Sequence, residues 1–175
     1  NAHPALEAAA ALPEGPRRIP ALERRFNRYF RRVPNYLCVS EWVRGKLRDF
    51  APQAERVAVV HNGIDWPALA GAPPSAELAR LAAGRKVVVN VGFLEPRKNQ
   101  RLVLEVAAAL RAEPVLFALA GDGPDRPELE DTARRLGLRE NVAFLGLRND
   151  VPALMRASDL CLHTARCENC PLTLI

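Results

Sequence analysis

The 175-residue sequence has no apolar run that approaches the length needed to cross a bilayer. Its alanine run at residues 8–11 is too short and too weakly apolar for a secretory signal. It has only four cysteines, and three of them lie between Cys161 and Cys170, which is not the pattern of a secreted disulfide framework. We therefore expect a cytoplasmic protein without a membrane-spanning helix.

The composition is that of an ordinary globular protein, with 49% hydrophobic and 26% charged residues. A net charge of +5 and a pI near 9.4 favour an anionic partner, but they do not choose among phosphate, nucleic acid and a membrane surface. The chain starts at Asn1 without a methionine and stops at Ile175 inside an apolar run. We expect both ends to be cut from a longer protein.

Residues 21–33 are predicted to form an amphipathic helix that Pro34 ends. Its arginines surround an apolar stripe that consists of Leu22, Phe26, Tyr29, Phe30 and Val33. A surface helix packed on a sheet is the favoured interpretation. Peripheral contact of Leu22 to Val33 with anionic lipid at the inner face of the membrane comes next, and nucleic acid comes last, so we expect no nucleic-acid partner.

Strands and helices are predicted to alternate along the rest of the chain. The spacing predicts strands at residues 36–39, 57–60, 87–91, 115–120, 142–145 and 160–163, and helices at 41–50, from 99 to about 110, at 125–136 and at 150–157. In the helix that starts at Asn99, the apolar positions are Leu102, Val103, Val106 and Leu110. This alternation predicts an α/β fold, a Rossmann-like parallel sheet with flanking helices and right-handed crossovers.

Caps and boundaries follow from polar and turn residues. Ser40 is expected to cap the helix that it precedes, and Asp125 with Glu128 has the spacing of a capping box. In the helix that follows this capping box, the residues expected to face the core are Leu129, Ala133 and Leu136. Pro67, Gly71, Pro73 and Pro74 mark a change of composition, so we expect a first domain at residues 1–66, a linker at 67–84 and a second domain at 85–175.

The stretch around Gly92 has the features of an anion site. A β-branched strand ends at Gly92, a loop with Arg97 and Lys98 follows, and a helix begins near Asn99. The first N–H groups and the dipole of such a helix favour a phosphate at the loop. The alternative is a solvated basic loop, and both interpretations stay open. The turn at residues 121–124 lacks the third glycine of the dinucleotide fingerprint, which argues against a dehydrogenase.

A second candidate site is a cluster of soft ligands near the end of the chain. It consists of Cys161, His163, Cys167 and Cys170, and its last two members have the spacing of a zinc knuckle or a redox pair. We favour the simpler interpretation, because Cys161 lies in a predicted buried strand and no second cysteine pair completes a typical site. No bound metal is expected.

Taken in order, the motifs are more specific than any of them alone. They run from the Val59 to Asp65 stretch, through Val91 and Gly92, Pro96 with Lys98 and Asn99, Gly121 to Pro124 and Val142 to Gly146, to Asp150–Asp159 and Glu168–Ile175. This series resembles the family-four retaining glycosyltransferases from about Tyr36 onward. The resemblance implies an incomplete GT-B architecture, in which the first domain holds the acceptor and the second binds a nucleoside diphosphate sugar.

The same resemblance implies roles in the glycine loop. Gly92, Phe93, Arg97 and Lys98 fall at the donor diphosphate, and Lys98 matches the lysine of the family's cationic pair. Phe93 stands where the family has an arginine, and Arg97 is the candidate replacement. A cation there stabilises the charge that the leaving diphosphate develops without a metal or cofactor. The backbone near Leu147 is expected at the base of the nucleotide.

The resemblance also implies roles after the last strand. Glu168 matches the first of two paired glutamates and is expected, with Lys98, to act in catalysis, while Asn169, Cys170 and Pro171 lie close to the donor sugar. The second glutamate is expected at position 176. The implied activity is transfer of a sugar, with retention, to a carbohydrate, lipid-linked or small-molecule acceptor, and residues 1–175 alone are expected to be inactive. The alternative is a non-catalytic basic module that binds a nucleotide or a membrane surface.

Overall fold

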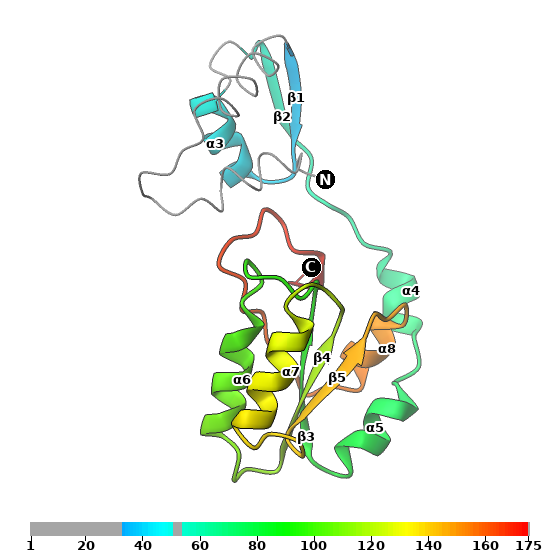
Figure 1. The fold of residues 1–175 in the computed structure, drawn as a ribbon. Coiled ribbons are helices and arrows are strands. Elements are labelled where there is room, and N and C mark those ends of the chain that lie inside the picture. The colour runs from blue at the N-terminus through cyan, green and yellow to red at the C-terminus, as the bar shows by residue number, and fades with distance from the viewer. Residues whose placement is uncertain (1–32, 51–53, 175) are drawn as a thin grey trace. The chain divides into compact units, whose positions relative to one another are not determined.

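A computed structural model of the protein describes residues 33–50 and 54–174 and divides the chain into two compact units (Figure 1). The first unit comprises Asn1–Ile64 together with Cys167–Ile175, and the second comprises Asp65–Arg166. The predicted helix at residues 21–33 lies outside the described residues except for Val33. The domain boundaries named above stay a prediction.

Within its described residues, the first unit contains a pair of parallel strands joined by an α-helix. β1 (Asn35–Cys38) pairs with β2 (Arg56–Val59), and α3 (Glu41–Phe50) connects them. Both strands start one residue earlier than predicted. Ser40 caps α3 as expected, since its Oγ accepts a hydrogen bond from Val43 N at 3.3 Å. Among the residues described in this unit, Cys38, Val43 and Leu47 form a buried cluster with partly buried neighbours.

The second unit is a four-stranded parallel sheet with the strand order β5-β4-β3-β6. Its elements are α4 (Trp66–Gly71), α5 (Ala76–Ala82), β3 (Lys86–Val91), α6 (Gln100–Ala109), β4 (Val115–Ala120), α7 (Arg126–Arg135), β5 (Val142–Gly146), α8 (Val151–Arg156) and β6 (Leu160–Cys161). A short 3-10 helix, η1 (Leu172–Leu174), follows in the first unit. The parallel sheet with flanking helices confirms the predicted α/β fold class.

Two apolar layers enclose this sheet. α6 and α7 lie side by side on one face (Figure 1), where Val103, Leu104, Phe117 and Leu129 are buried together. On the opposite face, α5 and α8 contribute Leu78, Ala82 and Leu154 to a cluster with alternate residues of β3 and β4. β4 is buried on both faces along nearly its whole length, as a central parallel strand should be.

Residues 67–84, the predicted linker, contain α5 and most of α4. In α5, Leu78 is completely buried and Ala82 nearly so. Ser75 caps this helix through its Oγ, and its backbone N–H donates to the Ala153 carbonyl at 2.9 Å. Proline and glycine mark turns here, but the apolar spacing of the residues after Ser75 lets α5 join the core of the second unit.

Two local predictions in α7 are wrong. Asp125 has a helical backbone (φ −81°, ψ −7°) and makes no side-chain cap, so the capping box with Glu128 does not form. An N-cap side chain reaches the helix N–H groups from an extended conformation, which Asp125 lacks. Leu136 is 39% exposed, because the chain turns at Gly137 and brings Leu138 into the core instead.

The last strand, β6, is shorter than predicted. Only Leu160 and Cys161 pair with β3, opposite Val88 and Val89. At the next residue a side chain contacts the backbone of this segment, since Asn90 Nδ2 donates a hydrogen bond to the Leu162 carbonyl at 2.7 Å. A side-chain bond at the next carbonyl replaces continuation of the regular ladder.

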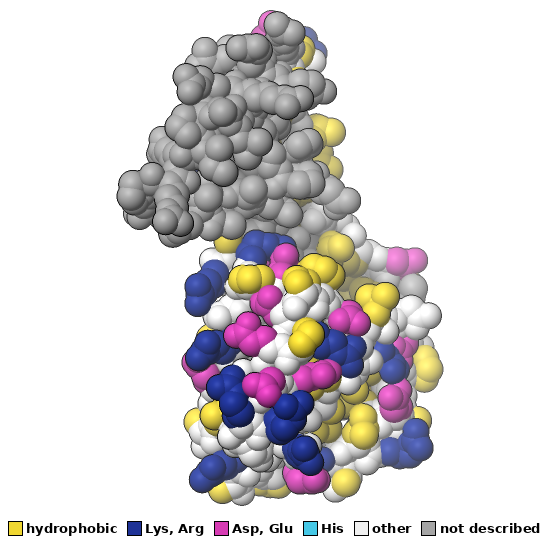
Figure 2. All heavy atoms as spheres, in the orientation of Figure 1, with side chains coloured by type: hydrophobic (Ala, Val, Ile, Leu, Met, Phe, Trp, Pro, Cys, Tyr) yellow, Lys and Arg dark blue, Asp and Glu magenta, His cyan; other side chains and the backbone are white. Residues whose placement is uncertain are grey.

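Charges are mixed on the surface of the second unit. Figure 2 shows basic and acidic side chains interspersed over the α6–α7 face. Many are paired along one helix, as Arg126 is with Glu130 at 2.7 Å and Arg135 with Asp131 at 3.0 Å. The positive net charge is therefore not gathered into a basic patch on this face. No helix among the described residues has both the length and the hydropathy of a membrane span.

Candidate functional site

The loops that follow β3, β4 and β5 meet at the carboxyl edge of the sheet in the second unit. Backbone hydrogen bonds join them, from Gly92 N to the Ala120 carbonyl at 3.0 Å and from Gly121 N to the Gly146 carbonyl at 2.8 Å. Open α/β sheets bind ligands at this edge. The predicted glycine loop therefore lies where a ligand site is expected.

Two glycines allow the loops to approach this closely. Gly121 has φ +147°, and a Cβ on it would lie 1.9 Å from the Gly92 carbonyl oxygen. Gly123 has φ +158°, and its Cβ would lie 2.3 Å from the Leu94 carbonyl oxygen. Any side chain at either position would collide with backbone. The turn at residues 121–124 is thus a brace that fixes the shape of the Gly92 loop.

Lys98 lies against Gly92 in the loop that follows β3. A Cβ on Gly92 would be 3.8 Å from Lys98 Cδ and 3.9 Å from its Cε, so the lysine stem lies beside the glycine. The Lys98 carbonyl accepts a hydrogen bond from Thr164 Oγ1 at 2.9 Å. This contact anchors the backbone of Lys98 to the segment after β6.

The helix that follows Lys98 starts in an unusual way. Asn99 has a left-handed backbone (φ 55°, ψ 43°), and its side chain makes no hydrogen bond to the N-terminus of α6. Asparagine tolerates this conformation better than most residues. The Asn99 side-chain oxygen therefore does not accept from the first N–H groups of α6. Those N–H groups can donate to a bound anion instead.

Gln100 is a residue of this region that sequence reasoning missed. It is 2% exposed, and its Nε2 donates to the Phe93 carbonyl at 3.0 Å. A signal was available, because Gln100 falls on the helix face that also carries Val103, Leu104 and Ala107. A polar residue on an otherwise apolar face indicates a specific hydrogen bond, and here that bond holds the Gly92 loop to α6.

The two other predicted diphosphate residues differ in their surroundings. Phe93 is 55% exposed at the loop surface. Arg97 forms an ion pair with Glu95, with 2.8 Å between Nη2 and Oε1, and both side chains are largely covered. The backbone carbonyl of Arg97 also accepts from Arg166 N at 2.9 Å. Part of the Arg97 charge is therefore balanced within the loop.

The end of β5 carries a charged network beside Leu147, which is 84% exposed. Arg148 binds both carboxylate oxygens of Asp150 at 2.8 Å and reaches Glu77 of α5 at 2.8 Å. These bonds hold the pKa of Asp150 below its usual value. The carboxylate of Asp150 is occupied by Arg148 and does not cap α8. The network fixes the loop from which Leu147 projects.

The predicted donor-sugar residues lie in the first unit. Glu168, Asn169, Cys170 and Pro171 belong to a segment, residues 162–171, that forms neither helix nor strand. The Cys170 carbonyl accepts a hydrogen bond from Asn62 Nδ2 at 3.2 Å. The structure thus gathers Gly92, Phe93, Arg97 and Lys98 in one loop of the second unit, and Glu168 to Pro171 in one loop of the first.

The cysteine cluster does not form a metal site among the residues that the structure describes. All four cysteines are free thiols. No group of three or more His, Cys, Asp or Glu side chains within the described ranges is arranged to hold a metal ion. Burial raises the pKa of the Cys161 thiol, which favours its protonated form.

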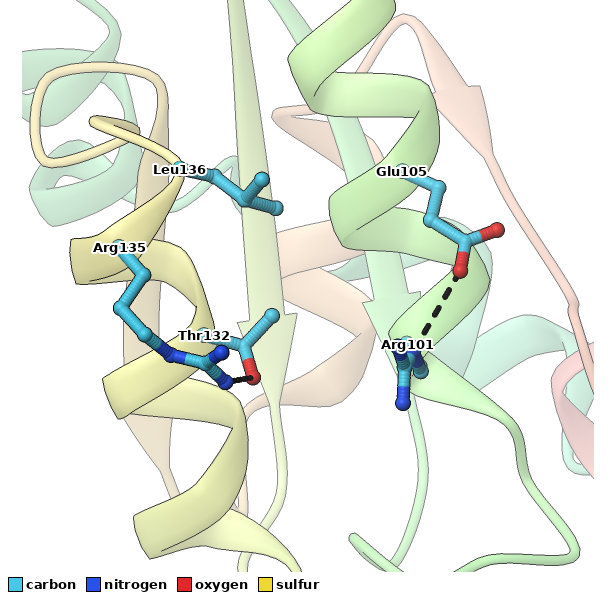
Figure 3. A pocket seen from close by; sticks show the side chains of 5 residues that line it. All are labelled: Arg101, Glu105, Thr132, Arg135 and Leu136. Atoms are coloured by element: carbon cyan, nitrogen blue, oxygen red, sulfur yellow. Dashed lines mark hydrogen bonds and ion pairs between the residues drawn. The ribbon is translucent and has the colours of Figure 1, made fainter.

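Two hollows lie along α6 and α7. The first, of about 180 Å³, is lined by Arg101, Glu105, Thr132, Arg135 and Leu136 (Figure 3). Figure 3 shows the Arg135 side chain bonded to Thr132 and Arg101 paired with Glu105, and none of the predicted site residues lines this hollow.

The second hollow, of about 210 Å³, lies between the N-terminal ends of the two helices. Its lining includes Asn99, Gln100, Asp125 and Glu128. Burial, with the nearby Glu128 and Glu95 carboxylates, raises the pKa of Asp125. Arg101 and Arg166 also line the second hollow, so it carries charges of both signs, and none of the predicted site residues lines it.

Comparison with known proteins points to one family. The sequence profile described as "Glycosyl transferases group 1" matches residues 77–175. The lipopolysaccharide glucosyltransferase WaaG of Escherichia coli (strain K12) is 33% identical over 138 residues, which cover 73% of this chain and 36% of WaaG. The chain spans about a third of the length of the curated relatives it matches.

Solved structures agree with this result. HepE from Anabaena, in complex with UDP and glucose, has a TM-score of 0.73 and 26% identity over 89% of this chain and 44% of HepE. The WaaG crystal structure has a TM-score of 0.63 and 29% identity over 76% of this chain and 38% of WaaG. The sheet and its flanking helices therefore have the arrangement found in GT-B glycosyltransferases.

Proposed function

This chain belongs to the glycosyl transferases group 1 family, and we propose on that premise that the protein transfers a sugar from a nucleoside diphosphate sugar to an acceptor. The observation that carries the proposal is the Lys98 stem lying against Gly92 at the carboxyl edge of the sheet. The loop there is braced by glycine contacts and is followed by a helix N-terminus. These features together suit a diphosphate.

In the proposed reaction, the diphosphate is the leaving group. Negative charge grows on its oxygens as the bond to the sugar breaks, and a cation held in place beforehand stabilises that charge. Lys98 supplies it as a point charge, and Arg97 adds to it from the same loop. These two side chains supply the positive charge that a metal ion would otherwise provide, so the proposal requires no metal ion or other cofactor.

The donor sugar is proposed to meet the other loop. Glu168 would position the sugar, and the backbone of Asn169, Cys170 and Pro171 would lie beside it. The base of the nucleotide would pack near Leu147, whose loop is fixed by Arg148. A uridine nucleotide is the first candidate, because HepE is described in complex with UDP and with UDP-glucose.

The remaining features of the activity extend this proposal. We propose that transfer proceeds with retention of the anomeric configuration, in the cytoplasm, to a carbohydrate, lipid-linked or small-molecule acceptor. Contact of Leu22 to Val33 with the inner membrane surface would bring a lipid-linked acceptor within reach. Residues 1–175 alone are expected to be inactive, since the chain covers only about a third of its relatives.

Donor-dependent transfer by the full-length protein tests the proposed function. The protein would be incubated with UDP-glucose, UDP-galactose or UDP-N-acetylglucosamine and a panel of acceptors, and the anomer of the first product would be assigned by NMR. We expect one UDP-sugar to be consumed, with a retained anomer and no loss of rate in EDTA. Failure of every donor, with the fold intact, would favour the non-catalytic binding module.

A further inference from the structure

A hydrogen bond joins two segments that lie 108 residues apart in the sequence. Asn62 Nδ2 donates to the Cys170 carbonyl oxygen at 3.2 Å, and both residues are partly buried. Both belong to the first unit, in which Asn62 comes shortly before the chain passes into the second unit and Cys170 shortly after it returns. The bond therefore joins the segment that precedes the second unit in the sequence to the segment that follows it.

The segment that carries Asn62 is itself anchored. Val60 N donates to the Cys38 carbonyl at 2.8 Å and extends the contact between β2 and β1. His61 Nδ1 lies 3.2 Å from the Val39 carbonyl oxygen. The Asn62 amide thus projects from backbone that is fixed to a sheet, which makes it a firm support for a loop.

The acceptor of this bond lies in the loop proposed to meet the donor sugar. Pro171 restricts the preceding residue, Cys170, to extended conformations and has no N–H of its own. Because residues 162–171 form neither helix nor strand, no regular ladder sets the direction of the Cys170 carbonyl. The Asn62 amide supplies that direction.

We propose that Asn62 is a positioning residue for the donor sugar. By holding the Cys170 carbonyl, it keeps the segment from Glu168 to Pro171 in the conformation that meets the sugar. This inference rests on the proposed function. Asn62 has no role in holding the diphosphate, whose proposed partner is Lys98, so its loss affects recognition of the sugar and not of the nucleotide.

The test compares two ligands in the full-length protein. Asn62→Asp keeps the size of the side chain but removes its N–H donor, and Asn62→Ala removes the whole amide. UDP and UDP-glucose would each be titrated by calorimetry. We expect the affinity for UDP-glucose to fall about 2- to 12-fold, the range for one net hydrogen bond, while the affinity for UDP changes less than about 2-fold.

Asn141→Ala is the matched control. Asn141 Nδ2 donates to the Arg111 carbonyl at 3.3 Å, which is an equivalent bond in the second unit. We expect this variant to keep the wild-type ratio of the two affinities. Equal loss of UDP and UDP-glucose in the Asn62 variants, or an unchanged ratio, would overturn the positioning role.

Thiol labelling tests the contact without any nucleotide. We expect iodoacetamide to modify Cys170 about 2- to 12-fold faster in Asn62→Asp than in the wild type, with Cys161 unchanged, as measured by mass spectrometry. Equal rates of Cys170 labelling in Asn62→Asp and in the wild type would overturn this inference and leave the proposed function unaffected. A wild-type protein that binds neither UDP nor UDP-glucose would overturn the proposed function, and this inference with it.

Discussion

Replacing Gly121 with alanine should destabilise the second unit severely, because the new methyl group has nowhere to go. Its Cβ would lie 1.9 Å from the Gly92 carbonyl oxygen and 2.8 Å from the Gly92 carbonyl carbon. Both atoms are backbone, so no side chain can rotate away. The two loops must separate by about 1 Å or more to reach ordinary contact distance.

The cost has two parts. A non-glycine residue at φ +147° costs about 1–3 kcal/mol of backbone strain. Separating the loops also endangers the hydrogen bonds from Gly92 N to the Ala120 carbonyl and from Leu94 N to the Asp122 carbonyl, each with a net worth of about 0.5–1.5 kcal/mol. The total is about 2–6 kcal/mol, a large part of the stability of an ordinary domain.

Gly137→Ala provides the matched control. Gly137 also has a positive φ, +70°, but a Cβ there would meet no atom within 4 Å. This variant therefore carries only the strain of a left-handed residue, about 1–2 kcal/mol. Equilibrium urea unfolding followed by circular dichroism would compare the two free energies of unfolding. If Gly121→Ala costs no more than Gly137→Ala, the glycine brace under the Gly92 loop is refuted.

Three further predictions concern neighbouring parts of the second unit. Arg97→Ala should weaken UDP-glucose binding about 2- to 5-fold, less than loss of an unpaired cation, because Glu95 already balances part of its charge; unchanged affinity in calorimetry would reject its role. Leu78→Ala should cost about 2–5 kcal/mol in urea unfolding, whereas a true linker would lose almost nothing. The depressed pKa of Asp150 means that its pairing with Arg148 stabilises the fold above about pH 4 and is lost below it, so Asp150→Asn should flatten the acid limb of a pH–stability profile.

The fold class was predictable because the central strands have a clear sequence pattern. β3 and β4 are short, nearly continuous apolar runs, and each is followed by a segment with helical spacing. The helix faces were harder to assign. Four apolar residues predicted the inner stripe of α6, yet Leu102 and Leu110 are about 40% exposed, and Leu104 and Ala107 are buried in their place. Spacing restricts a helix face only to neighbouring rows of side chains, and packing against the sheet decides between them.

Of the candidate site, the proximity of Lys98 to Gly92 follows from the order of the residues in the sequence. Lys98 and Gly92 could be paired because a strand, a loop and a helix start follow one another directly. Gln100 and Asn62 escaped prediction, because their roles depend on contacts with carbonyl groups that spacing cannot reveal. The packing of α5 was not predicted, because the proline and glycine residues before Ser75 indicate turns, whereas the burial of Leu78 and Ala82 depends on contacts with the sheet.

The most direct test of the central claim is the affinity of the full-length protein for UDP with and without the Lys98 ammonium group. We expect Lys98→Ala to weaken UDP binding about 10- to 100-fold, the effect of losing a charged hydrogen-bond partner. Lys86→Ala is the matched control, because Lys86 pairs with Asp159 at the amino end of the same strand. Equal UDP affinity in Lys98→Ala and Lys86→Ala would contradict a diphosphate site at Gly92.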